Sequence, residues 1–164
     1  MRTHVRFHSV EFTPPNTEPG QINTERYGYA LAAWVGARLQ ERGFEADLPV
    51  PEDWGWLLGV ANDGQVVRVG CGNVDGSVSE WLIWLDAVRP GLIARLLGKG
   101  GSSSRAPNAL FGIAAAIHSA LTANTSANEI EWFNVGPRGK SSITPIPRCN
   151  RSALSSRASA RDLL

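Results

Sequence analysis

A chain of 164 residues has the length of one ordinary domain and can bury a core without disulfides or metal ions. Its apolar content of 43% excludes a chain that is disordered throughout, and its two cysteines, far apart in sequence, exclude a disulfide framework. The net charge of +1 hides two unlike parts. Residues 11–86 hold 12 acidic and 4 basic residues, a net charge of −8, whereas residues 138–164 hold 1 acidic and 6 basic residues, a net charge of +5.

The N-terminal segment argues against export. Residues 2–12 alternate between polar and apolar side chains and contain no apolar run of the kind found in a signal peptide. No stretch of the sequence approaches the roughly 18 uninterrupted apolar residues that a membrane span needs. We therefore expect a soluble cytoplasmic protein without membrane contacts, and the two cysteines fit a reducing compartment.

The first part of the chain predicts a strand, a loop and a long helix. Residues 2–12 alternate as a strand does, and residues 13–23 contain three prolines and a glycine, which favour a loop. Residues 24–43 repeat apolar side chains at helical spacing and predict the clearest helix of the chain. Asn23 or Thr24 is expected to cap the N-terminus of this helix.

The central part predicts strands joined by tight turns. Residues 44–50 alternate, and a proline within them indicates a strand at the edge of a sheet. Residues 54–62 and 65–72 are joined around an Asn-Asp-Gly sequence, which is typical of a β-hairpin. Residues 79–88 predict the next strand, after a second tight connection.

The last part predicts two helices, a strand and an unstructured end. Residues 90–100 and 108–123 predict helices, and the Gly/Ser-rich residues 98–107 predict a flexible linker between them. Residues 128–135 predict a final strand. The Ser/Arg-rich residues 138–164 contain few core-forming side chains, and we expect them to be disordered.

These elements predict one α+β domain over residues 1–137, followed by a basic tail over residues 138–164. Strands joined by short turns must be antiparallel neighbours, because parallel pairs need long crossovers. We therefore expect a two-layer sandwich, in which a mostly antiparallel sheet of five to six strands carries two or three helices on one face.

The stretch PEDWGWLLGV, residues 51–60, places two carboxylates beside two tryptophans where a strand begins. It has two interpretations. One is an ordinary strand entry, with the tryptophans on the core and a carboxylate bonded to the turn. The other is a surface in which Glu52, Asp53 and Trp54 bind a cationic or planar group, because carboxylates and aromatic faces both attract such groups.

The alternation of side chains in a strand gives each residue of this stretch an expected position. Trp56 should be buried against the helix, and Trp54 should lie at the rim of the same sheet face, partly exposed. Glu52 is expected beside Trp54 on the surface. Asp53 is expected to accept backbone hydrogen bonds in the turn.

No motif predicts a cofactor or a metal ion. The glycines of GCGNVDG, residues 70–76, are spaced somewhat as in a dinucleotide-binding turn, but a strand is predicted to follow, and a phosphate site needs a helix N-terminus. Cys71 has no base placed by sequence to activate it and is expected to be a buried strand residue. His4 and His8 would lie about 13 Å apart along a strand, and His118 has no ligating partner one helical turn away.

The basic tail is a weak signal for nucleic acid. Its arginines, Arg148, Arg151, Arg157 and Arg161, could contact phosphates. The tail has no aromatic residue to stack on bases, however, and the body of the protein is acidic. We therefore expect no nucleic-acid partner.

Two sequence patterns occur in order along the central part of the chain. The first consists of Tyr27, Gly28, Ala30, Leu31, Ala32 and Trp34, and the second runs from Glu52 to Trp56. The run from about residue 22 to residue 85 thereby resembles small uncharacterised bacterial proteins in which a YG-ALA-W helix precedes an EDWGW strand. The resemblance implies a shared fold unit. Because this family has no assigned activity, it implies no site residues.

Two functions from different classes fit the sequence. The first is a non-enzymatic binding protein, of the inhibitor or immunity type, that presents an acidic and aromatic surface to a basic protein partner. The alternative is a small enzyme or small-ligand binder that uses Glu52 or Asp53 in a Trp-lined pocket. Adjacent carboxylates on a strand point to opposite faces and cannot act on one reacting centre, so we favour the first. The oligomeric state stays open.

Overall fold

The computed structural model describes residues 2–62, 64–88, 105–135 and 141–142, and every structural statement below concerns these residues. Their elements follow the chain as β1 His4–His8, α1 Tyr29–Gln40, β2 Glu45–Ala46, β3 Val50–Glu52, β4 Gly55–Asn62, β5 Gln65–Asn73, β6 Glu80–Ala87, α3 Arg105–Ala123, β7 Asn128–Val135 and β8 Ser141–Ser142. None of the described helices is long and apolar enough to cross a membrane.

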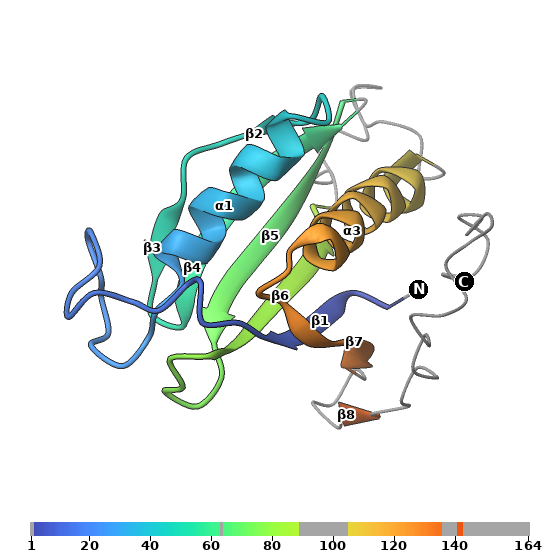
Figure 1. The fold of residues 1–164 in the computed structure, drawn as a ribbon. Coiled ribbons are helices and arrows are strands. Elements are labelled where there is room, and N and C mark those ends of the chain that lie inside the picture. The colour runs from blue at the N-terminus through green and yellow to red at the C-terminus, as the bar shows by residue number, and fades with distance from the viewer. Residues whose placement is uncertain (1, 63, 89–104, 136–140, 143–164) are drawn as a thin grey trace.

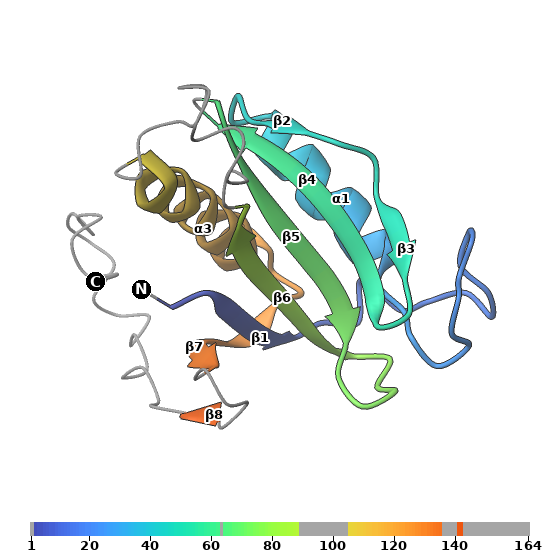
Figure 2. The same ribbon diagram turned by 180° about the vertical axis from the view of Figure 1, so that it is seen from behind.

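The strands form an antiparallel sheet in the order β2-β4-β5-β6-β1-β7-β8, and β3 pairs with the same edge of β4 as β2 does. Helices α1 and α3 lie side by side on one face of the sheet (Figures 1 and 2). The predicted two-layer α+β sandwich is confirmed, with eight strands in place of five to six. The additional strands are short, because the predicted edge strand is divided into β2 and β3 and because β8 has only two residues.

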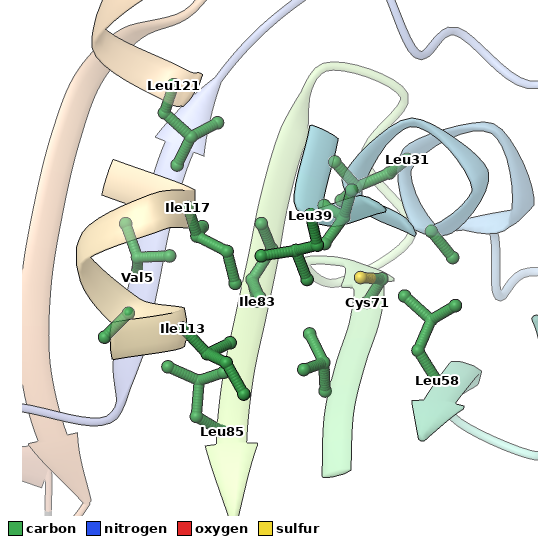
Figure 3. Close-up of a cluster of buried hydrophobic side chains, with 14 of the residues drawn as sticks. Val5, Leu31, Leu39, Leu58, Cys71, Ile83, Leu85, Ile113, Ile117 and Leu121 are labelled. Atoms are coloured by element: carbon green, nitrogen blue, oxygen red, sulfur yellow. The ribbon is translucent and has the colours of Figure 1, made fainter. Parts of the chain in front are cut away.

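The core lies between the two helices and the sheet (Figure 3). Alternate residues of β4, β5 and β6 face the helices and are buried. The labelled core side chains are Leu31 and Leu39 of α1, Ile113, Ile117 and Leu121 of α3, and Val5, Leu58, Cys71, Ile83 and Leu85 of the strands. Each large aliphatic side chain buried in this way contributes about 1.5–3 kcal/mol to folding.

Helix α1 begins later than its sequence pattern indicates. It starts at Tyr29, and neither Asn23 nor Thr24 caps it. The carboxylate of Glu18, from the proline-rich loop, instead accepts hydrogen bonds from the backbone N–H groups of Gly28 and Tyr29 at 2.9 and 3.0 Å. The predicted cap by Asn23 or Thr24 was wrong, because the hydrogen-bond acceptor at the start of the helix comes from another segment of the chain.

Two predicted strands are shorter than the alternation of their side chains indicates. The first ends at His8, and Val10 beyond it is 71% exposed. The strand predicted over residues 44–50 is interrupted around Leu48, which is 85% exposed, before β3 begins. In both segments the alternation continues beyond the last backbone pairing, so alternation alone does not show where a strand ends.

The C-terminal predictions are tested only in part. The strand over residues 128–135 is confirmed as β7. Helix α3 starts at Arg105, so residues 105–107, predicted as linker, are helical. The helix predicted over residues 90–100 and nearly all of the predicted tail lie outside the described residues, except for β8.

Alanine substitutions at two glycines of the α1 region are expected to change the stability of the protein in opposite directions. A Cβ on Gly28, whose φ is 157°, would lie 2.6 Å from the carbonyl oxygen of Cys71, whereas a Cβ on Gly36 would lie 3.6 Å from the nearest atom, in Leu58. We expect Gly28→Ala to lower the free energy of unfolding by at least about 1–3 kcal/mol. Gly36→Ala should raise it by about 0.5–1 kcal/mol, because alanine loses less entropy in a helix. Urea unfolding of both variants tests this, and equal effects of the two substitutions would contradict it.

His118 of α3 packs against β7. Its ring contacts that of Trp132 edge to face, with centroids 6.3 Å apart, and its Nδ1 accepts a hydrogen bond of 3.2 Å from the indole N–H. Burial lowers the pKa of His118 below its ordinary value. His118 therefore has a packing role between α3 and β7.

We expect the protein to lose stability as the pH falls from about 7.5 to about 5.5, across the ordinary histidine pKa. The pKa of His118 is lower in the folded state, so as the pH falls the unfolded chain binds a proton at a higher pH than the folded protein does. Proton binding therefore stabilises the unfolded state relative to the folded state. Burial lowers the pKa of His4 as well, which adds an effect of the same sign. Urea midpoints at the two pH values should differ less in His118→Gln than in the unaltered protein. An unchanged difference would exclude His118 as a source.

Candidate functional site

An open groove of about 470 Å³ lies at one end of the sheet, where two turns meet. Strands β4 and β5 pair with Trp56 opposite Cys71, so the turn before β4 lies beside the turn after β5. The first turn contributes Asp53 and Trp54 to the groove, and the second contributes Asp75. The hairpin register thus assembles the groove from segments about twenty residues apart in the sequence.

Two tryptophans form the aromatic part of the groove. The ring centroids of Trp54 and Trp84 lie 5.1 Å apart, with an angle of 52° between the ring planes. Trp84 points away from the helices, because its neighbours Ile83 and Leu85 point into the core. Its indole occupies the space above Gly70 on β5, where any Cβ would overlap the ring. The strand backbone therefore supports one side of this indole, and both tryptophans are half-buried.

The structure corrects the position expected for Trp54. It is partly exposed, as predicted, but it packs on Trp84 and so belongs to the helix-free side of the sheet, opposite to Trp56. Asp53 and Trp54 form a turn, and Gly55 after them has a φ of 151°. Strict alternation holds only for extended backbone, so it does not carry over from β4 into this turn.

The charged side chains of the groove take part in none of the ion pairs that the described residues form. Asp53 and Asp75 are exposed and Arg26 is half-buried. The three described ion pairs join Arg6 to Glu80, Arg38 to Glu41 and Arg68 to Asp86. Two carboxylates and one guanidinium are thus available to a ligand of the groove.

Two of the three predicted site residues meet in the groove. Asp53 and Trp54 line it. The backbone hydrogen bonds expected for the Asp53 carboxylate are not made with any described residue, so this carboxylate faces solvent. Glu52 lies in β3 opposite Gly55, is half-buried and does not line the groove.

The buried amide of Asn73 holds the rim of the groove together. Its side-chain oxygen accepts a hydrogen bond of 3.1 Å from the backbone of Tyr27. Its side-chain nitrogen donates to the carbonyl oxygens of Glu25 and Ser77 at 3.2 and 3.0 Å. The loop before α1 is thereby joined to the turn that carries Asp75, and a rim fixed in this way is preorganised for binding.

A second polar cluster lies at the same end of the sheet as the groove, on the side that the helices cover. Glu18 is 2% exposed, and its carboxylate accepts a hydrogen bond of 2.7 Å from the indole N–H of Trp56, in addition to its bonds at the start of α1. Trp56, itself 2% exposed, meets the ring of Tyr29 edge to face at a centroid distance of 5.0 Å. The predicted burial of Trp56 against the helix is confirmed.

Three residues that line the groove were not predicted as site residues from the sequence. Trp84, Asp75 and Arg26 line the groove, yet none stood out as a site residue. One signal was present: the predicted hairpin already placed the two turns at the same end of the sheet, and counting its register would have brought them together. The glycines of residues 70–76 were compared with a dinucleotide-binding turn, but in the structure Gly70 makes room for the indole of Trp84 and Gly72 makes room for the backbone of Trp54.

Cys71 is a core residue, as predicted. It is fully buried on β5, and burial raises the pKa of its thiol far above the ordinary range. Among the residues that the structure describes, no three side chains of metal-ligating type come together.

Comparison of the chain with protein-family models, curated proteins and solved structures gives no match. The chemistry of the groove is therefore inferred from its own geometry.

Replacing Trp54 by alanine should lower the free energy of unfolding by less than about 2 kcal/mol, because this indole is half-buried and lies outside the helix-covered core. Urea unfolding followed by circular dichroism measures the loss. Val66→Ala, at an exposed position on the same sheet face, is the control. A loss as large as that of a core tryptophan would show that the Trp54–Trp84 contact is mainly structural.

Proposed function

We propose that this chain is a non-enzymatic binding protein, of the inhibitor or immunity type, that presents the groove to a basic protein partner. The observation that carries the proposal is the juxtaposition of Asp53 and Asp75 with the indoles of Trp54 and Trp84 in one open groove. Aromatic side chains are enriched among the residues that dominate binding energies, and complementary charge raises association rates and sets specificity.

The charge of the surrounding protein supports the same proposal. Residues 11–86, which contribute most of the groove, carry 12 acidic and 4 basic residues. Their negative potential would attract a basic protein before contact and repel an acidic one. The free carboxylates of the groove would then set the register of the complex.

The proposal predicts salt-sensitive capture of a basic protein by the unaltered chain. The immobilised protein would be exposed to extract from its native host, and captured proteins would be identified and titrated individually in purified form. Asp53→Asn and Trp54→Ala should each weaken the titrated complex at least about tenfold, as at other centres of binding energy. Glu45→Gln, an exposed acid of β2 outside the groove, is the matched control.

Two results would contradict this function. One is a partner whose affinity does not change with ionic strength, because exposed charges are screened within about 8–10 Å at ordinary salt. The other is an affinity that Asp53→Asn and Trp54→Ala leave unchanged. In either case the corner at residues 51–60 is a strand entry without a binding role.

A small-ligand site is the second candidate, and the size of the groove favours it. A volume of about 470 Å³ is within the range of small-molecule sites, which is about 300–1,000 Å³. Asp53 would be the functional carboxylate, since Glu52 does not line the groove. Loss of ligand binding or turnover in Asp53→Asn, with Glu52→Gln unaffected and both variants folded, would support this candidate. It would also displace the protein-binding function.

A further inference from the structure

We infer that the group bound in the groove is an arginine side chain of the partner, held with its guanidinium over the indole of Trp84 and between the carboxylates of Asp53 and Asp75. The inference rests on the proposed function and specifies its ligand. Its basis is the placement of one supported aromatic surface and two free carboxylates in a single open groove.

The aromatic part of the groove favours a planar cation. The indole of Trp84 lies over Gly70, so backbone supports one of its sides, and Trp54 meets it at 52°. A flat guanidinium can stack on such a surface, and it is more weakly hydrated than an ammonium group. In a groove that is open to water this difference counts, because a lysine would keep most of its hydration and gain little from the ring.

The polar part of the groove favours a donor with several N–H groups. Asp53 and Asp75 are both exposed and outside the described ion pairs, and they belong to different turns. The guanidinium has five N–H donors in one plane, which suit carboxylates approaching from two sides. The amide of Asn73 is already bonded to backbone on both sides, so the two carboxylates are the main acceptors.

Removal of Arg26 tests the inference through the direction in which the binding affinity changes. It lines the same groove and carries the same charge as the inferred ligand. Its removal should therefore strengthen the binding of an arginine side chain. A ligand with both an ammonium and a carboxylate group would instead use Arg26 as a partner, and removal of Arg26 would weaken its binding.

The test is a titration of the full chain with two capped tripeptides, tri-arginine and tri-lysine, followed by the indole N–H signals in NMR spectra. Tri-arginine should bind about two- to fivefold more tightly than tri-lysine, the contribution expected of cation–π contacts at exposed sites. The signals of Trp54 and Trp84 should shift, while that of the buried Trp56 should not. Arg26→Gln should raise the affinity for tri-arginine, and Asp53→Asn and Asp75→Asn should each lower it.

Gly70→Ala removes the aromatic contribution without altering a charge. The added methyl group would displace the indole of Trp84, so the preference for arginine over lysine should disappear. Val66→Ala, on the same strand and face, should keep the preference. If Gly70→Ala does not fold, Trp84→Phe is used instead and should reduce the preference for arginine, since it retains an aromatic ring but weakens the cation–π contact.

The outcomes separate the inference from the proposed function. Equal affinities for the two peptides, both lowered by Asp53→Asn, would overturn the arginine inference and retain the acidic binding groove. Weaker binding of tri-arginine in Arg26→Gln would overturn the inference as well. Failure of both peptides to bind would overturn the inference, while salt-sensitive capture of a basic protein would still test the proposed function separately.

Discussion

Replacing Trp56 by alanine is expected to lower the free energy of unfolding by about 3–5 kcal/mol, the range for large buried aromatic residues. The side chain is 2% exposed and lies where β4, the start of α1 and the proline-rich loop meet. Its removal leaves a cavity beside Tyr29 and takes one hydrogen-bond donor from the buried carboxylate of Glu18. Urea unfolding measures the loss, provided that the slope of the transition is unchanged.

The comparison with Trp54→Ala gives this prediction its control. The two tryptophans are two residues apart, but one is buried under α1 and the other is half-buried on the opposite side of the sheet. Trp56→Phe helps to separate the two causes, because it removes the indole N–H and part of the ring system but keeps most of the apolar volume. Equal losses for Trp54→Ala and Trp56→Ala would contradict the different packing of the two side chains.

Replacing Glu18 by alanine is expected to lower the free energy of unfolding by at least about 2 kcal/mol, because two of its hydrogen bonds are buried and each buried donor left unpaired costs about 1–3 kcal/mol. Three donors depend on this carboxylate: the N–H groups of Gly28 and Tyr29 and the indole N–H of Trp56, at 2.9, 3.0 and 2.7 Å. The negative charge also lies at the positive end of α1, where a carboxylate is favourable. Urea unfolding gives the loss, and circular dichroism shows whether helix content falls with it.

Two variants control for Glu18→Ala. Glu25→Ala removes an exposed carboxylate from the same stretch before α1 and should change stability by less than about 0.5 kcal/mol. Glu18→Gln should lie between the two, since an amide oxygen can still accept hydrogen bonds while the amide nitrogen cannot. A double-mutant cycle of Glu18→Ala with Trp56→Phe should show a coupling of about 0.5–3 kcal/mol, as for other residues in contact. Additive losses would contradict the hydrogen bond between the two side chains.

The amino-acid sequence by itself determined the elements and their layers. Helix α1, the β4–β5 hairpin, β6 and β7 follow from apolar periodicity and turn residues, which act over a few neighbouring positions. The burial of Trp56 was predictable for the same reason, since it lies within the regular alternation of β4. Antiparallel pairing followed from the short connections, because chain length leaves no other arrangement.

Tertiary structure alone decided the cap of α1 and the groove. Glu18 reaches Trp56 from 38 positions away, and nothing in the proline-rich loop specifies which donors its carboxylate will meet. Trp54 changes sides because a turn with a glycine of positive φ interrupts the alternation that places Trp56. The groove exists because the register of β4, β5 and β6 brings Asp53, Asp75 and Trp84 to one end of the sheet. Periodicity places side chains within an element, whereas contacts between elements depend on packing that only the complete fold specifies.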